Sequence, residues 1–225
     1  MLDLHQTSLA YLLMAISAAV GAVASASSEG TPDASAVATP PKFQEQAGTG
    51  LRPVSAFAGI QDDQLRSVAI FLEAGRVFQS PRCLNCHPAE RMPTQGDDMH
   101  AHVPYMQAGS KNSGVPGLPC KTCHGVANAA TLTAPIASIP GDPSWALAPA
   151  LMAWQGKSLR EICLQIKDPA RNGGRSLDAI REHVAKDHLV GWAWRPGEGR
   201  RPAPGTQEGF SQLIRAWIET GAGCP

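Results

Sequence analysis

Apolar side chains recur at helical spacing in four stretches of the chain, all of them after residue 60. The first stretch, 62–78, begins at a possible N-cap, Asp62, and ends before Ser80-Pro81. Apolar residues at positions i, i+3, i+4 and i+7 predict one buried face of this helix, made of Leu65, Val68, Ala69 and Leu72.

The last third of the chain predicts further helices. Ser158 and Glu161 have the spacing of a capping box, and the helix that they begin ends at Asp168-Pro169. A second helix begins after Ser176 and reaches about residue 186. The first of these two helices carries a single apolar stripe, made of Leu159, Ile162, Cys163 and Ile166.

The clearest helical pattern lies near the C-terminus. Thr206 is the predicted N-cap, and Gly221 supplies the C-terminal stop. The apolar residues that share one face of this helix are Phe210, Leu213, Ile214, Trp217 and Ile218.

The stretches between these helices are predicted to be irregular. Residues 88–119, 125–157 and 191–205 contain many breaks in the form of proline and glycine. The chain has 22 Gly and 19 Pro but only 5% aromatic residues, which favours helices joined by long loops over a regular sheet. The predicted fold class is therefore mainly α with long irregular loops, folded as a single domain over residues 61–225.

The N-terminus carries a compartment signal. Residues 9–24 form an apolar run without charge, shorter than the roughly 20 residues of a membrane span, and Ala24-Ser25-Ala26 follows as a cleavage pattern. Residues 1–26 are predicted to be a signal peptide for export to the periplasm, and 27–60 a flexible leader. Because no Lys or Arg precedes the run, a retained membrane anchor is the alternative.

Charge gives no indication of a nucleic acid partner. The chain has 19 Lys and Arg against 19 Asp and Glu, so its formal net charge is zero. Contact with a membrane is expected only if the N-terminal segment is retained.

Four of the six cysteines lie in two copies of one motif, CLNCH at 83–87 and CKTCH at 120–124. Cys-x-x-Cys-His is the attachment pattern of c-type haem, in which two thiols form thioether bonds and the histidine ligates the iron. The predicted covalent ligands of two haems are Cys83, Cys86, Cys120 and Cys123, and the predicted proximal iron ligands are His87 and His124. The loop between the motifs is too short for a complete domain, so both haems are expected in one compact unit.

Three other interpretations of the motifs compete with haem. A four-cysteine zinc site is one, although its cysteine pairs are usually closer together and zinc does not need a histidine after each pair. Structural disulfides and a thioredoxin-type dithiol are the others. The dithiol calls for a neighbouring βαβ pattern, which the sequence lacks.

The two remaining cysteines are Cys163, on an apolar helix face, and Cys224, just beyond the last helix. In an oxidising compartment a disulfide between them is expected. The alternative is two separate thiols, one buried and one exposed.

The sixth iron ligands determine what two haems can do, because an empty position lets small molecules bind and a filled one does not. Periodicity and position leave several side chains open. The candidates are Met92, Met99, His100, His102, Met106, Met152, His183 and His188.

Several segments resemble a group of small secreted proteins labelled as isoquinoline 1-oxidoreductase subunits. The resemblance covers roughly 78–225, and its most specific segments are DPARNGG and GWAW. It implies a cytochrome c-like di-haem domain with His102 and His183 as distal iron ligands and Met152 as the third choice. Relatives often have a histidine where this chain has Ala146, so ligation can differ between them.

The sequence thus predicts an exported di-haem c-type cytochrome. The resemblance implies that it transfers electrons from a molybdenum hydroxylase or dehydrogenase to a respiratory acceptor, a cytochrome or oxidase. The alternative function is a haem peroxidase or small-gas sensor with one open iron site. Arginines that could pair with haem propionates are Arg171, Arg175, Arg195, Arg200 and Arg201.

Overall fold

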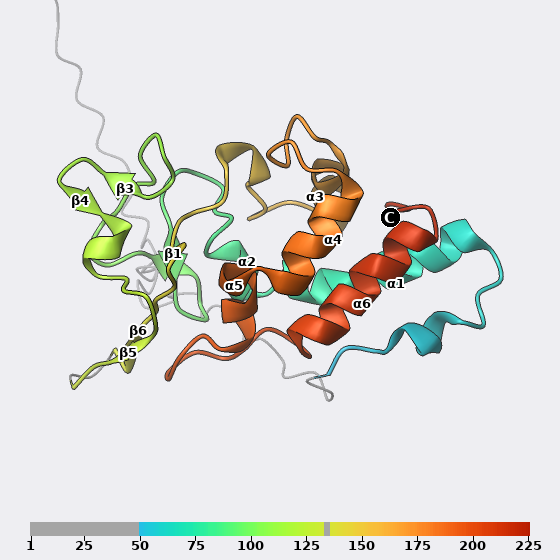
Figure 1. The fold of residues 1–225 in the computed structure, drawn as a ribbon, viewed down its shortest axis with the longest axis horizontal. Coiled ribbons are helices and arrows are strands. Elements are labelled where there is room, and N and C mark those ends of the chain that lie inside the picture. The colour runs from blue at the N-terminus through green and yellow to red at the C-terminus, as the bar shows by residue number, and fades with distance from the viewer. Residues whose placement is uncertain (1–49, 133–135) are drawn as a thin grey trace, which may run out of the picture. The chain divides into compact units, whose positions relative to one another are not determined.

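Two long helices from opposite ends of the folded chain lie side by side (Figure 1), and residues of both belong to the hydrophobic core. This computed structural model describes residues 50–132 and 136–225. Helix α1 (Asp63–Phe78) packs against α6 (Gln207–Glu219), which also contacts α4 (Leu177–Lys186). Helix α3 (Leu159–Lys167) lies against α1. Helix is the main secondary structure of the described residues, in agreement with the predicted mainly α class.

Aromatic side chains fill the space between α1 and α6. The ring of Phe71 lies 5.0 Å from that of Trp217, and Phe78 meets Phe210 edge to face at 5.1 Å. The indole of Trp217 is fully buried, and its N–H donates to the carbonyl of Gly223 at 2.8 Å. Long-range packing of this kind stabilises short helices that would be marginal alone.

The predicted buried face of α1 is wrong. Leu65 and Leu72 are exposed, at 63% and 46%, while Ile70 and Phe71 are buried. Both sets of residues have helical spacing, and the large aromatic rings on the second set bury more apolar surface against α6. The pattern therefore identified the helix but not the side that it buries.

The helix boundaries agree with the predicted caps. The side chains of Asp62, Ser158, Ser176 and Thr206 each accept a backbone N–H from the first turn of the helix that follows. Ser158 and Glu161 form the reciprocal capping box. The predicted disulfide between Cys163 and Cys224 is also present, and it connects α3 to the chain segment after α6.

The stretches between the long helices contain short elements that the sequence did not reveal. Three antiparallel pairs of two-residue strands occur: β1 (Thr94–Gln95) with β2 (His100–Ala101), β3 (Gly114–Val115) with β4 (Leu118–Pro119), and β5 (Ala129–Ala130) with β6 (Ser138–Ile139). Helix α2 (Pro81–Leu84) precedes them, and 3₁₀ turns occur at Cys120–Thr122 and Ala150–Met152.

Residues 191–205, predicted to be loop, begin as helix. Helix α5 (His188–Gly191) continues directly into a 3₁₀ turn at Trp192–Trp194. The carboxylate of Asp187 caps α5 by accepting the N–H groups of Leu189 and Val190. Because many glycines and prolines follow this segment, its composition predicted a loop and not a short helix.

The folded part begins earlier than predicted. Residues 50–60 were assigned to the flexible leader, but a 3₁₀ turn at Val54–Phe57 places Phe57 in the core with 1% of its surface exposed. The backbone N–H of Arg52 donates to Glu73 of α1. The predicted signal peptide and the first part of the leader, residues 1–49, lie outside the described residues. In the part of the chain that the structure describes, no helix has the length and apolar character that crossing a membrane requires.

Candidate functional site

Both Cys-x-x-Cys-His motifs fold into the same turn. The backbone N–H of His87 donates to the carbonyl of Cys83 at 3.0 Å, and His124 donates to Cys120 at the same distance. An i→i−4 bond closes one helical turn, so the residues three and four positions after the first cysteine return to the side on which that cysteine lies. The local backbone thus holds the two thiols and the imidazole of each motif close together.

The imidazoles of the two motifs are held in the same way. Nδ1 of His87 lies 2.7 Å from the carbonyl oxygen of Met152, and Nδ1 of His124 lies 2.7 Å from that of Pro140. A carbonyl oxygen only accepts, so each Nδ1 carries the proton and each Nε2 presents a lone pair. This second-sphere hydrogen bond is typical of histidines that bind a metal through the other nitrogen.

One segment, residues 140–155, supports both histidines. Besides supplying both carbonyl acceptors, it stacks Trp154 on His87, with ring centroids 3.5 Å apart, and Trp145 on His124 at 4.7 Å. The backbone N–H of Trp154 also donates to the carbonyl of His87. The two sites therefore share a common structural support, as expected for motifs so close in sequence.

Burial favours the neutral form of the motif histidines and of the first motif's cysteines. Burial lowers the pKa of His87 to about 4, although its hydrogen bond to Met152 opposes the shift, and burial also lowers the pKa of His124. Burial raises the pKa of Cys83 to about 12 and that of Cys86 to about 11, with partial opposition from Arg82. Neutral imidazoles are the form in which histidine ligates iron.

His102 lies beside the histidine of the second motif. The ring centroids of His102 and His124 are 5.8 Å apart, with an angle of 61° between the rings. Nδ1 of His102 donates to the carbonyl of Pro104 at 2.8 Å, which leaves the Nε2 lone pair available. A metal held between two imidazoles by bonds of about 2 Å each requires centroids about 6 Å apart. The pair therefore has the separation that a shared metal needs.

His183 lies within electrostatic range of the histidine of the first motif. A positive charge on His183 lowers the pKa of His87. Nδ1 of His183 is 3.2 Å from the carboxylate of Asp187, one helical turn later, so this histidine too has its Nδ1 proton bound and its Nε2 available. Burial and the charge of Arg175 lower the pKa of His183, and Asp187 opposes them.

The structure separates the other candidate ligands from these pairs. His100 uses both ring nitrogens: Nδ1 faces Asp98 at 2.6 Å and Nε2 faces Gln95 at 3.0 Å. Met152 belongs to the hydrophobic core, and its backbone carbonyl contacts His87. For Met99 and His188 no contact to a motif histidine occurs among the described residues.

The four motif cysteines are free thiols, so neither motif forms a disulfide. Within 50–132 and 136–225, no three His, Cys, Asp or Glu side chains gather in a way that would hold a metal ion. The two cysteine pairs thus do not converge on one four-cysteine zinc cluster in this fold. The chemistry of each motif, with two thiols and one oriented imidazole, fits one c-type haem.

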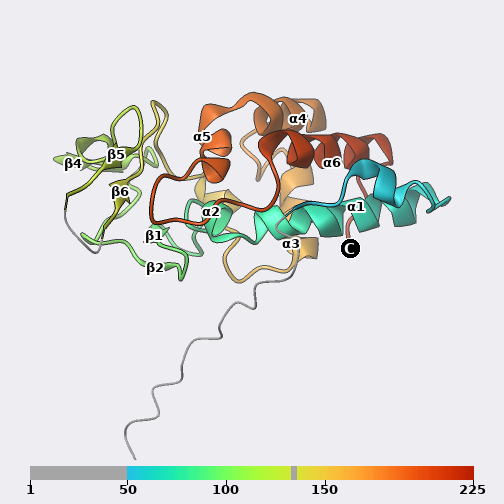
Figure 2. The same cartoon turned by 90° about the horizontal axis from the view of Figure 1, so that it is seen from below.

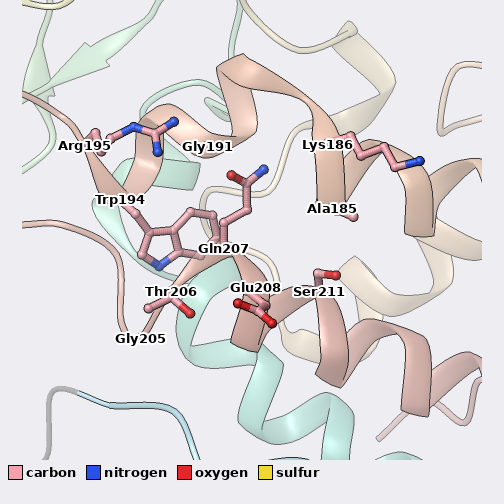
Figure 3. A pocket seen from close by; sticks show the side chains of 10 residues that line it. All are labelled: Ala185, Lys186, Gly191, Trp194, Arg195, Gly205, Thr206, Gln207, Glu208 and Ser211. Carbon is pink, nitrogen blue, oxygen red and sulfur yellow. The ribbon is translucent and has the colours of Figure 1, made fainter.

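Hollows on the surface of the described residues include one beside His102 and one at the start of α6. One lies beside His102 and is lined mainly by apolar groups, among them Met92 and Met106. The other lies at the start of α6 between Lys186 and Arg195, with the indole of Trp194 in its wall (Figure 3). The second hollow contains no motif residue, whereas the first adjoins the second motif through His102.

Sequence reasoning missed two features of the site. The backbone carbonyls of Met152 and Pro140 leave no side-chain signature. Arg82 directly precedes Cys83, yet its burial, with 3% of its surface exposed, depends on the loop at 96–97 that covers it. Its position next to the motif was the only signal in the sequence.

Comparisons with known proteins do not identify a family. No protein-family model matches the chain, and neither a curated protein nor a solved structure matches it. The resemblance to secreted di-haem proteins therefore remains a prediction, and function is inferred from the residues of this chain.

Proposed function

We propose that this protein is an exported di-haem c-type cytochrome that transfers electrons. The observation that carries the proposal is the pair of His102 and His124, whose ring centroids are 5.8 Å apart. It is supported by His183, which lies within electrostatic range of His87. All four donate their Nδ1 proton to an oxygen acceptor, which prepares Nε2 for a metal. Such a set of four is hard to explain by core packing alone.

Each residue has a defined part in this proposal. Cys83 and Cys86 would bind the first haem through thioether bonds, and Cys120 and Cys123 the second. His87 and His124 would be the proximal ligands, with His183 and His102 as the respective distal ligands. When bound, the haems supply irons that gain and lose single electrons. The chain fixes the histidines through their Nδ1 hydrogen bonds, and thereby tunes the potential.

Two ligands for each iron favour electron transfer over reactions that need an open iron position. A peroxidase or gas sensor needs such a position, and here a histidine lies near each motif histidine. The electron donor suggested by the family resemblance is a molybdenum hydroxylase or dehydrogenase, and the acceptor a respiratory cytochrome or oxidase. A role outside the cytoplasm fits the Cys163–Cys224 disulfide, since such bonds persist in oxidising compartments.

The first test is the mass and colour of the exported protein. Production in a host that attaches c-type haem should give a red protein whose mass exceeds that of the bare chain by two haems. Replacing Cys83 and Cys86 by Ser should remove one haem, and replacing Cys120 and Cys123 should remove the other. A colourless wild-type protein with the bare-chain mass would contradict the proposal.

A further inference from the structure

Arg82 is the least accessible charged side chain beside the first motif. It lies in α2 directly before Cys83, and only 3% of its surface is exposed. Nη2 donates to the carbonyl of Gly96 at 2.8 Å and to the carboxylate of Asp97 at 2.7 Å. Nε and Nη1 are buried and have no hydrogen-bond partner among the described residues. Two of the three nitrogens of this guanidinium therefore have no acceptor within the described residues.

Two further guanidinium groups lie around the same carboxylate. Nε of Arg201 donates to the second oxygen of Asp97 at 3.0 Å. Arg200 lies within electrostatic range of both Arg82 and Asp97, and Ser138 holds its guanidinium. We call Arg82, Arg200, Arg201 and Asp97 the arginine cluster. It contains three positive charges and one negative charge.

The arginine cluster lies within reach of both motifs. The charge of Arg82 acts on the thiols of Cys83 and Cys86, and the charge of Arg200 acts on His124. The ring of Trp192 lies below the Arg82 guanidinium at 6.0 Å and meets Trp145 edge to face at 5.0 Å. The cluster therefore adjoins the ligands of the first predicted haem and those of the second.

Buried N–H groups that lack an acceptor destabilise the fold, because they lose hydrogen bonds to water and form none in the protein. Nε–H and Nη1–H point to different sides of the guanidinium, because Nη1 is cis to Cδ, so one carboxylate cannot bind both in parallel. A carboxylate oxygen is still the acceptor best suited to either group, since its charge strengthens the hydrogen bond. In the described part of the chain, Asp97 is the only carboxylate that contacts Arg82, and it already pairs with Nη2 and with Arg201. Within 50–132 and 136–225 no acceptor remains for these donors, so the open side of Arg82 is free for a ligand.

We propose that the arginine cluster is a carboxylate-binding site that receives a haem propionate, with an open N–H group of Arg82 as the donor. This inference rests on the proposed function, because the haem supplies the carboxylate. Arg82 is then a positioning residue: it orients the porphyrin and adds positive charge next to the iron. Of the arginines suggested by the sequence, Arg200 and Arg201 belong to this site.

The test uses the exported holoprotein and three variants. Arg82→Leu removes the charge, Arg82→Lys keeps the charge but lacks the fork, and Arg215→Leu is the control on the exposed face of α6. Arg215 is exposed and pairs with Glu219, one turn away. The measurements are the resonance Raman propionate-bending band and the midpoint potential of each haem in a redox titration.

The propionate band is expected to shift in both Arg82 variants and to stay unchanged in Arg215→Leu. The midpoint potential of at least one haem is expected to fall in Arg82→Leu, because loss of a nearby positive charge favours the more positive oxidised iron. Arg82→Lys should lower it less. If Arg82→Leu fails to fold, the propionate band of Arg82→Lys is compared with that of the wild type instead.

An unchanged propionate band in a folded, red Arg82 variant would overturn this inference and leave the proposed function intact. A colourless wild-type protein would instead defeat the proposed function. A band that responds to acetate at constant ionic strength, rather than to the Arg82 substitutions, would show that the site takes an anion from solution, which also overturns the inference.

Discussion

The imidazole of His102 lies 5.8 Å from that of His124, although a loop with a two-residue strand pair separates the two along the chain. Both rings donate their Nδ1 proton to a backbone carbonyl, His102 to Pro104 and His124 to Pro140. This separation is the one that the proposed ligation of a single metal by both imidazoles requires. The relationship between His183 and His87 is looser, since electrostatic influence alone connects them.

We expect each distal histidine to control one iron. His102→Ala should open the second iron and His183→Ala the first, so the reduced form of either variant should bind CO at about half of its haems. Difference spectra with CO, together with EPR of the oxidised forms, measure this. His100→Ala is the control, because hydrogen bonds occupy both of its ring nitrogens. Equal CO binding in all three variants and the wild type would refute the assignment.

Gly141 controls the position of the carbonyl that orients His124. A methyl group at Gly141 would overlap the backbone oxygens of Ala127 and Gly125, and neither can yield as a flexible side chain does. We expect Gly141→Ala to lower the free energy of unfolding by about 1–3 kcal/mol and to change the spectrum of the second haem.

The control is Gly125→Ala, on the other side of the β5–β6 pair, where an added Cβ meets nothing within 4 Å. It should leave both properties nearly unchanged. Thermal unfolding followed by circular dichroism measures the stability of both variants. A loss of similar size in the two variants would mean that the crowding at residue 141 is not the cause.

The cysteines of the first motif should react slowly in the chain produced without haem. The thiolate is the reactive form, and a rise in the pKa of Cys86 from 9.0 to about 11 reduces its thiolate fraction roughly a hundredfold near neutral pH. Alkylation at pH 8, followed by peptide mass mapping, should therefore label exposed Cys123 before Cys83 or Cys86. Equal labelling rates would contradict the burial of the first motif.

The raised pKa values of Cys83 and Cys86 should make the haem-free fold less stable at alkaline pH. The unfolded chain releases the protons of Cys83 and Cys86 near pH 9, whereas the folded chain holds them to about pH 12 and 11. The haem-free fold should therefore keep its stability below pH 9 and lose it as the pH rises through this interval. Urea unfolding at several pH values measures the loss.

Removal of the disulfide should destabilise the whole unit. Cys163 and Cys224 are 61 residues apart in sequence. In the chain-entropy description, closing a loop of that size raises the free energy of the unfolded chain by about 4 kcal/mol. The double variant Cys163→Ala with Cys224→Ala should show a loss of about 2–4 kcal/mol in urea unfolding. Wild-type protein treated with a reductant is the control. A difference under about 1 kcal/mol would show that packing of α3 against the C-terminal segment suffices.

Local sequence signals determined the helices and the chemistry of the motifs. Capping residues such as Ser158 and Thr206 act on the first turn that follows them, so their meaning does not depend on distant parts of the chain. The motif at 83–87 is equally local, since its hydrogen bond from His87 to Cys83 closes a single turn. Features of this kind can be read directly from neighbouring residues.

Only the tertiary structure decided which side of α1 is buried, which histidines meet, and that Arg82 is enclosed with unpaired donors. Each of these depends on contacts between segments far apart in the sequence: Phe71 with Trp217, His102 with His124, and Arg82 with Asp97. Spacing along a helix gives the period of a pattern but not the partner that covers it, and a backbone carbonyl such as that of Met152 has no sequence signature. Burial and pairing arise when the chain folds back on itself, so they belong to the fold and not to any local stretch of residues.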